Sequence, residues 1–304
     1  MMHAPLLFLG FCFLSVYQPV ASWGDVGHRT VAYLAERFLT DRGAQFANDL
    51  LANNRGFDIS DASVWADTVK RKRPYTRPWH YIDAEDRPPA TCSVHYEDDC
   101  DKAGCIVSAM ENMTQQLTDP STDTMEQKEA LMYLIHFFGD LHQPMHVEAT
   151  RRGGNDIPVC FDRRCSGQNL HSVWDTAIPH KINGIKHNLK HNDERNASAE
   201  WAERLYQTTG ELPGLAQECS DIRSPLQCIM QWAKETNSLI CTFALKKGVS
   251  WVEKHNLGDE YYDKAVPIVE EQIARAAMRL AVWINTIAAE RPSSTEPLLI
   301  QNDL

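Results

Sequence analysis

The chain has 304 residues and a formal net charge of −11 at neutral pH. An acidic protein gains little from non-specific attraction to phosphate, so this charge argues against a protein that coats duplex nucleic acid. The length suits one large domain.

An uncharged, mostly apolar stretch occupies residues 3–20. It has about the length of a signal-peptide core and is too short to span a bilayer, although no Lys or Arg precedes it. We therefore predict a signal peptide over 1–22, cleaved after Ser22, then one domain over 23–290. The polar, proline-containing residues 291–304 predict a disordered tail. No later run is apolar enough for a membrane anchor, so we expect a secreted protein.

The cysteines also fit an oxidising compartment. Nine are present, and Cys12 would leave with the signal peptide, so an even number remains. Zinc-thiolate binding is less favoured, because no Cys-x-x-Cys motif occurs. Spacing favours three local loops and one long-range pair, although sequence alone does not fix the connectivity. The expected pairs are Cys100 with Cys105, Cys160 with Cys165, Cys219 with Cys228, and Cys92 with Cys241. Two sequons predict glycosylation at Asn112 and Asn196.

Helical spacing dominates the first half of the chain. Apolar residues recur with helical spacing over 31–38. Thr40 is placed to cap the next helix, whose apolar side holds Phe46, Leu50 and Leu51. Residues 126–142 are apolar nearly all round, as in a buried central helix.

The second half continues the helical pattern. Alternating patterns are scarce, and only residues 157–161 suggest a short hairpin. Ser224 and Pro225 match N-cap and first-turn positions of a helix that Gly248 would end. A last long helix is expected over 261–289, kinked or restarted near Pro267. The sequence thus predicts an all-α, single, mainly helical domain with long loops, stapled by disulfides.

Two histidine–aspartate pairs stand out among the polar residues of the helices. His136 and Asp140 are four residues apart in the buried helix and so face the same way. His171 and Asp175 repeat this spacing, and His146 lies between the pairs. A single pair is weak evidence, since a core histidine beside a carboxylate is common. Two pairs favour a metal site, because imidazole and carboxylate ligands suit zinc and a buried unpaired carboxylate costs several kcal/mol.

Upstream candidates complete a recognisable set of motifs. His28, Asp67 and His80 are further candidate ligands. With these segments the mature chain resembles the class I nucleases, zinc-dependent single-strand-specific enzymes of fungi and plants that often have 3′-nucleotidase activity and share the helical fold of zinc-dependent phospholipase C. The segments are Trp23-Gly24-x-x-Gly27-His28, Trp65-Ala66-Asp67-Thr68, His80-Tyr81-Ile82-Asp83, Gly139-Asp140-Leu141-His142-Gln143-Pro144-Met145-His146, Gly153-Gly154-Asn155 and Asn169-Leu170-His171-x-x-Trp174-Asp175.

The resemblance implies three zinc ions per chain. The implied ligands are Asp67, His80, His136 and Asp140 for the first ion, His146, His171 and Asp175 for the second, and His28, Asp140 and the α-amine and carbonyl oxygen of Trp23 for the third. His142 matches no ligand, and we interpret it either as a structural histidine or as one that supports the ligands without binding metal itself. Surface positions are expected for the histidines in polar stretches, His95, His180, His187, His191 and His255.

Catalytic roles also follow from the resemblance. Three zinc ions and three aspartates would give the cluster a charge of about +3, which holds phosphate in an acidic protein. Zinc-activated water would then attack phosphorus in line and give 5′-phosphorylated products. Asp67 and Lys70 are expected to be catalytic, with Lys70 assisting the phosphate. The run over 70–73 can also be read as a solvated basic stretch, and we assign no role to its other residues.

Base binding is the last implied feature. Tyr81, Asp83 and Asn155 match positions that grip a nucleobase. Stacking contributes about 1–3 kcal/mol per base and needs an unpaired base, which predicts single-stranded DNA and RNA as substrates. Alternatively, Tyr81 only packs against a helix.

Two other functions stay open. A phospholipase C-like phosphodiesterase would have nearly the same metal ligands but should lack the base grip. A non-catalytic secreted zinc-binding protein would not need the complete ligand set. We expect neither a membrane nor an obligate protein partner.

Overall fold

The computed structural model describes residues 23–51, 57–185, 191–209 and 219–291. The expected signal peptide and the tail from residue 292 lie outside the described residues. Within the described part of the chain, the regular secondary structure is entirely helical, and β pairing is limited to isolated bridges. The predicted all-α fold is therefore confirmed. No described helix is long and apolar enough to cross a membrane.

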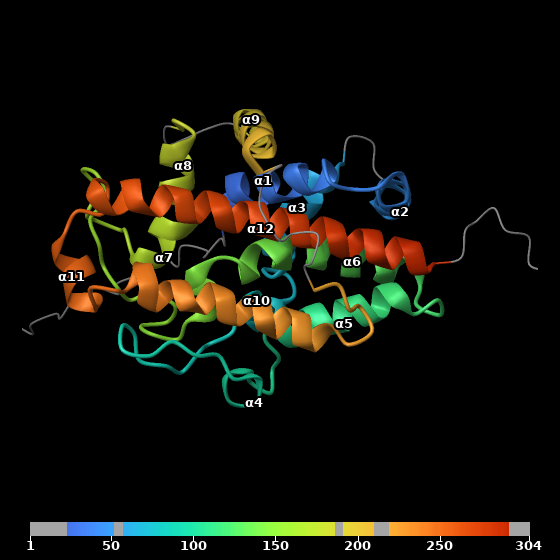
Figure 1. Cartoon of the computed structure of the whole chain (residues 1–304), viewed down its shortest axis with the longest axis horizontal. Helices are drawn as coiled ribbons and strands as arrows, with labels where there is room; N and C mark the ends of the chain where they lie inside the picture. The colour runs from blue at the N-terminus through green and yellow to red at the C-terminus, as the bar shows by residue number, and fades with distance from the viewer. Residues whose placement is uncertain (1–22, 52–56, 186–190, 210–218, 292–304) are drawn as a thin grey trace, which may run out of the picture.

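The helices vary from single turns to one that runs the length of the molecule (Figure 1). The α-helices are α1 (Gly24–Glu36), α2 (Asp41–Leu51), α3 (Ile59–Val69), α4 (Tyr96–Asp99), α5 (Ile106–Thr118), α6 (Thr124–Leu141), α7 (Leu170–Ser172), α8 (Ile178–Ile182), α9 (His191–Thr209), α10 (Pro225–Leu239), α11 (Val249–Lys254) and α12 (Glu260–Glu290). Short 3₁₀ segments are η1 (Pro74–His80) and η2 (Pro144–Val147), and π segments are η3 (Val173–Ala177) and η5 (Ile240–Ala244).

The centre of the fold is α6, as its apolar sequence predicts. Every residue from Ala130 to Leu141 is buried, and α6 contacts α3, α5 and α12. The Asp123 side chain caps its first turn by accepting from Met125 N at 2.8 Å. Polar residues at the end of α6 are therefore removed from water unless they line a cleft.

Most of the predicted helix boundaries are confirmed. Thr40 Oγ1 accepts from Gly43 N at 3.1 Å and caps α2. Gly248 does not end the helix that begins at Pro225: α10 ends at Leu239 and η5 at Ala244, and Gly248, with φ +82°, is the N-cap of α11. Ser224 stands at the N-cap of α10, but its side chain makes no capping bond. The predicted restart near Pro267 is wrong: α12 runs unbroken, and this proline lies in its early turns, where only one backbone hydrogen bond is lost.

The expected hairpin near residues 157–161 is present only as local bridges. Phe161 and Arg164 exchange both backbone hydrogen bonds, at 2.9 and 3.0 Å, around a tight turn. Pro158 pairs with Asn169 in a second isolated bridge. The segment is too short for a strand, and the adjacent disulfide holds it.

The cysteines pair as the spacing suggested. The four disulfides are Cys92–Cys241, Cys100–Cys105, Cys160–Cys165 and Cys219–Cys228. The first joins residues 149 positions apart in sequence, and the others close local loops. Both sequon asparagines, Asn112 and Asn196, are exposed, and their glycosylation stays a prediction.

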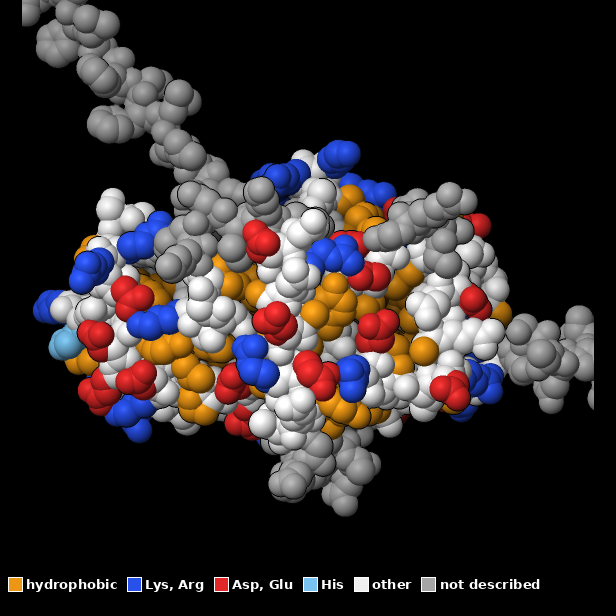
Figure 2. Space-filling view, turned by 90° about the horizontal axis from the view of Figure 1, so that it is seen from above, with side chains coloured by type: hydrophobic (Ala, Val, Ile, Leu, Met, Phe, Trp, Pro, Cys, Tyr) orange, Lys and Arg blue, Asp and Glu red, His pale blue; other side chains and the backbone are white. Residues whose placement is uncertain are grey.

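Charges of both signs are intermixed on the face seen from above. In Figure 2, the Lys and Arg side chains alternate with Asp and Glu and with apolar patches. The described residues of this face form no broad basic surface for duplex nucleic acid, in keeping with the net charge.

Candidate active site

One carboxylate, Asp140 near the end of α6, brings three histidines together. Its Oδ1 lies 3.2 Å from His28 Nε2, which comes from α1. Its Oδ2 lies 3.1 Å from His136 Nε2 and 2.9 Å from His80 Nδ1. All four side chains are buried. The two oxygens of Asp140 therefore face different histidines, which is the arrangement that a bridging carboxylate needs.

A second group lies beside the first. His171 Nε2 is 3.1 Å from Asp175 Oδ2, and His146 Nε2 is 3.8 Å from Asp175 Oδ1. The Gln143 amide donates a hydrogen bond to Asp175 Oδ1. His146 Nδ1 lies 4.0 Å from Asp140 Oδ1, so the two groups are adjacent.

Backbone carbonyls fix the orientation of three of these rings. In each, Nδ1 donates to a carbonyl oxygen and leaves Nε2 directed at a carboxylate. The pairs are His136 with Ser63 at 2.6 Å, His146 with His80 at 2.6 Å and His171 with Gly153 at 2.7 Å. Metal-binding histidines are usually held in this way, because the second nitrogen sets the tautomer and the ring plane.

Several atoms of these groups are buried and make no hydrogen bond. They are both ring nitrogens of His28, Nε2 of His80, His146 and His171, and Oδ1 of Asp140. An unsatisfied buried polar atom costs about 1–3 kcal/mol, so such a concentration needs an explanation. Imidazole nitrogens and carboxylate oxygens are zinc ligands. Three groups could hold a metal ion: His28, His136 and Asp140; Asp67, His80 and His136; and His146, His171 and Asp175.

Burial and neighbouring charges shift the pKa values of the candidate ligands in both directions. Burial lowers the pKa of His28 and His146, and burial with nearby Lys70 lowers that of His80 to about 4. Burial alone would raise the pKa of Asp67, but His136, Lys70 and His80 outweigh it and bring the value to about 2. At neutral pH, these three imidazoles are thus neutral and Asp67 is ionised, as metal coordination needs. Burial also acts to lower the pKa of His136 and His171, but Asp140 and Asp67 outweigh it at His136 and Asp175 outweighs it at His171, so both of these pKa values are raised.

Two glycines of the recognised motifs make room for these rings. A Cβ on Gly139 would lie 2.7 Å from His28 Nδ1, so any side chain there would displace that ring. The His28 and His136 rings stack at 3.9 Å. Gly153 has φ +58°, and a Cβ on it would lie 2.6 Å from Met145 O. Glycine at this position keeps its carbonyl on His171 without strain.

A cleft of about 640 Å³ opens beside the histidines. His80, His146 and His171 reach it, whereas His28, His136, Asp140 and Asp175 lie beneath its lining. The lining residues are Lys70, Arg71, Arg77, His80, Tyr81, Asp83, Glu85, Met145, His146, Glu148, Ala149, Arg152, Gly153, Asn155 and His171. All three residues expected to bind a base, Tyr81, Asp83 and Asn155, are among them.

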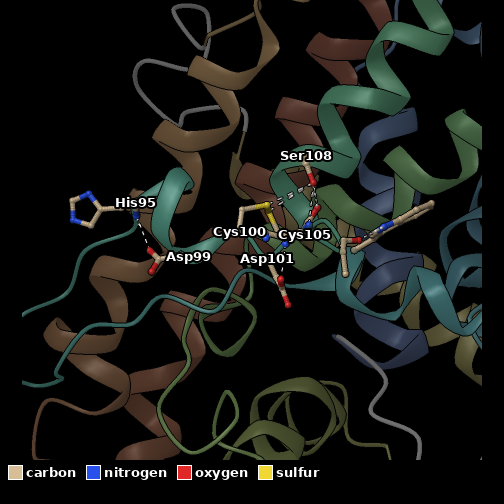
Figure 3. The surroundings of a disulfide bond; sticks show 9 residues. His95, Asp99, Cys100, Asp101, Cys105 and Ser108 are labelled. Atoms are coloured by element: carbon tan, nitrogen blue, oxygen red, sulfur yellow. Dashed lines mark hydrogen bonds between the residues drawn. A yellow bond between two sulfur atoms is a disulfide. The ribbon is translucent and has the colours of Figure 1, made fainter.

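The segment that carries Tyr81 is held from both sides. Tyr81 O accepts from Ile106 N at 2.9 Å, at the start of α5, and Ile82 N donates to His146 O at 2.9 Å. The Cys100–Cys105 disulfide lies just before α5, beside Ser108 (Figure 3). The Tyr81 side chain is 38% exposed, so its ring is available to a ligand rather than packed away.

The remaining expected site residues lie as follows. Lys70 Nζ is 2.5 Å from Asp67 Oδ1, beside the first histidine group. Trp23 is fully buried, and its carbonyl accepts from Gly27 N at 3.1 Å. Both nitrogens of His142 have partners: Nδ1 donates to Phe138 O at 2.7 Å, and Nε2 accepts from Arg279 at 2.9 Å. His142 is therefore structural, which is the first of the two interpretations.

The histidines expected at the surface differ in their exposure. His95 and His255 are exposed, whereas His180 is half-buried. The expectation is wrong for His180, because the helix turn that carries it packs against the fold. His187 and the side chain of His191 lie outside the described residues.

Two residues of the site were not assigned a role from the sequence. Gln143 belongs to the recognised motif, but its bond to Asp175 depends on the tight turn after α6. Glu148 is almost fully buried in the cleft wall, and burial raises its pKa to about 7. Its only sequence signal was an acidic residue two positions after a His-containing motif, which is too common to be informative.

Comparison with known proteins agrees with this geometry. The S1/P1 nuclease family profile matches residues 23–289. Nuclease S1 of Aspergillus oryzae is 34% identical over 292 residues, covering 91% of this chain and 96% of that protein. Nuclease P1 of Penicillium citrinum is 37% identical over 272 residues, covering 87% and 97%. Endonuclease 2 of Arabidopsis thaliana is 31% identical over 302 residues, covering 94% and 97%.

The match covers every segment that builds the two histidine groups and the cleft. The family is zinc-dependent in general, and its substrates are nucleic acids. The chain therefore belongs to the S1/P1 nuclease family and is a hydrolase, a nuclease of the single-strand-specific type.

Proposed function

We propose that this protein is a secreted, three-zinc endonuclease that cuts single-stranded DNA and RNA to 5′-phosphorylated products and also removes 3′-phosphates from nucleotides. The observation that supports this most strongly is the buried cluster around Asp140, where several unpaired nitrogens converge beneath a cleft lined by Tyr81, Asp83 and Asn155.

The proposed metal ligands all come from the groups described above, except for the N-terminal residue. They are Asp67, His80, His136 and Asp140 for one ion, His146, His171 and Asp175 for another, and His28, Asp140 and the main-chain amine and carbonyl of Trp23 for the third. Asp140 would bridge, in keeping with its two oxygens facing different histidines. Trp23 supports the third set because it is buried at the start of α1, five residues before His28.

Side chains around the cluster would assist the zinc ions in binding and neutralising the phosphate. When bound, zinc ions would lower the pKa of a water molecule and draw charge from the phosphate. Lys70 would neutralise phosphate charge, since its ammonium lines the cleft. Asp67 holds that ammonium at 2.5 Å and so orients it toward the reaction centre.

Base recognition explains a preference for unpaired strands. Tyr81 offers a partly exposed ring for stacking, and the Asp83 carboxylate and Asn155 amide can read a base edge. The Asn155 amide is anchored by donating to Arg152 O at 2.8 Å. A paired base in a duplex cannot present its face to the ring, so cleavage should be slow there.

Maturation completes the proposal. The disulfides fit an oxidising compartment. We place signal cleavage after Ser22, so that a single domain over 23–290 begins with Trp23. The new α-amine would then lie beside the cluster.

The test combines metal analysis with product identification. Purified mature protein is expected to contain about three zinc ions per chain and to cleave denatured DNA and RNA far faster than intact duplex. The products should carry 5′-phosphates, and phospholipid vesicles should not be hydrolysed. One zinc or fewer in active protein, equal rates on duplex, or preferred hydrolysis of phospholipid would each overturn the proposal.

A further inference from the structure

Three of the four Lys and Arg side chains that line the cleft come from one segment of the chain. Lys70, Arg71 and Arg77 come from one segment between α3 and the end of η1, ahead of Tyr81. Arg152 joins them from the loop after η2. These four cations are more than a single scissile phosphate requires.

Two of the cations have no partner within the described part of the chain. Arg71 and Arg77 are exposed, and neither guanidinium makes a hydrogen bond or an ion pair there. Their neighbours differ: Lys70 pairs with Asp67, and Arg73 makes a two-pronged pair with Glu129. The basic run thus separates into residues engaged by the fold and residues free to meet a ligand.

The backbone around Arg152 is held in a costly conformation. Four consecutive residues, Arg151 to Gly154, have φ values of +52°, +56°, +58° and +79°. Non-glycine residues lose about 1–2 kcal/mol each in this left-handed region. Such strain concentrates at functional sites. Here it places Arg152 in the cleft wall, where its side chain makes one exposed contact with Asp156 at 3.1 Å.

We propose that Arg71, Arg77 and Arg152 form a rim that binds the phosphodiesters flanking the scissile one, so that polynucleotides are distinguished from mononucleotides. The inference rests on the proposed nuclease function. A mononucleotide has one phosphate, which belongs at the histidine groups beside Lys70. Guanidinium groups match phosphate oxygens in a bidentate fork, and in a chain of net charge −11 such local cations are needed to admit a polyanion.

The test replaces the two unpaired arginines together, as Arg71→Gln with Arg77→Gln. Lys72→Gln is the matched control, because Lys72 is exposed in the same basic run but does not line the cleft. Arg152→Gln is measured separately. Binding of an uncleavable phosphorothioate oligothymidylate of about eight nucleotides is followed by fluorescence anisotropy at several salt concentrations. Dephosphorylation of a 3′-mononucleotide is measured in parallel.

The double variant should lose about 1.4 from the slope of log affinity against log salt, since each single-strand phosphate contact contributes about 0.7. Oligonucleotide affinity should fall about tenfold, which corresponds to about 1.4 kcal/mol, with at most a twofold change in kcat/KM for the mononucleotide. Arg152→Gln should lose about half as much slope, and Lys72→Gln should match the wild type.

An unchanged salt slope in the double variant would overturn the inference, as would equal losses in the Lys72→Gln control or on the mononucleotide. Failure of the proposed function looks different. In that case the wild type itself would neither cleave denatured DNA nor dephosphorylate the 3′-mononucleotide, whereas the anisotropy measurement would still report whether the rim binds a polynucleotide.

Discussion

Two buried histidines near the end of the same helix differ in what their ring nitrogens contact. His136 and His142 are both fully buried, six residues apart at the end of α6. Both nitrogens of His142 are satisfied, by Phe138 O and by Arg279. His136 uses Nδ1 on a carbonyl and directs Nε2 at two carboxylates and at another imidazole.

This difference distinguishes a candidate metal ligand from a structural histidine. Burial does not separate them, and neither does the pattern of apolar residues around them. The two histidines differ in what their Nε2 atom faces. In His142 it accepts a hydrogen bond from Arg279, which satisfies the ring. In His136 it faces two carboxylates and another imidazole, which are themselves candidate metal ligands.

The largest effect is expected for Asp140→Asn, which removes the carboxylate shared by both sides of the cluster. Without the bridging carboxylate two metal sites should be lost, so kcat/KM should fall about 10³-fold or more, which corresponds to about 4 kcal/mol of transition-state stabilisation. Zinc content should fall by about two ions, measured by elemental analysis. Glu126→Gln is the control, because Glu126 is exposed on the same helix. Full zinc content in Asp140→Asn would show that this carboxylate is not a bridge.

A nearly equal effect is expected from extending the mature N-terminus by Gly-Ser before Trp23. The nitrogen of Trp23 would become an amide, which is planar and has no lone pair to offer. A free amine has a pKa of about 7.7–8.0 and can lose its proton to a metal. The extended protein should therefore contain about one zinc fewer and lose most of its activity. Equal metal content in the two forms would exclude the terminal amine as a ligand.

Local sequence patterns predicted the helices well, because each depends on nearby residues. The apolar run in α6 and the Thr40 cap needed nothing distant. The histidine–aspartate spacings also predicted two shared faces correctly. The contacts of Asp140 with His28 and His80 could not be derived from spacing, since they join α1, η1 and α6. They were expected only through the resemblance to a family.

Two of the predictions that the structure contradicts, for Pro267 and for His180, fail for the same physical reason. The last helix was expected to be kinked or restarted near Pro267, and a restart does not occur, because packing of α12 along the molecule outweighs one missing hydrogen bond. His180 was expected at the surface from its polar neighbours, and the fold half-buries it. In each case tertiary packing overrides a local preference, which a single sequence does not display.

A smaller effect separates the two histidines directly. His142→Ala should leave the buried guanidinium of Arg279 without its ring acceptor and lower the free energy of unfolding by about 1–3 kcal/mol. Zinc content should stay unchanged. His171→Ala, on the other side, should reduce zinc content. Urea unfolding and elemental analysis on both variants test the distinction. Loss of zinc in His142→Ala at full folding would mean that satisfied hydrogen bonds do not identify a structural histidine.

The smallest effect concerns a carboxylate that serves the fold rather than the site. Asp61 accepts from buried Arg29 at 3.0 Å and from Arg195 at 2.9 Å, and so ties α3 to α1 and α9. Burial would raise the pKa of Asp61, but hydrogen bonds from Arg29 and Arg195 outweigh it and lower the pKa below its ordinary value. A lowered pKa means that the folded state favours the ionised form. Its contribution is therefore complete above the unfolded pKa of about 3.9 and is lost as the pH falls through the lower folded value.

Asp61→Asn should consequently be about 1 kcal/mol less stable than the wild type near neutral pH, a modest amount because the pair is partly exposed. As the pH is lowered below about 4, the difference should shrink, since the wild-type carboxyl then takes up a proton as well. Urea unfolding at several pH values measures this, on metal-free samples of both proteins so that zinc release does not contribute. A difference that stays constant across the acid range would mean that Asp61 stabilises the fold through its shape and not its charge. It would then differ from Asp140 in kind, because at Asp140 the charge itself is expected to be essential.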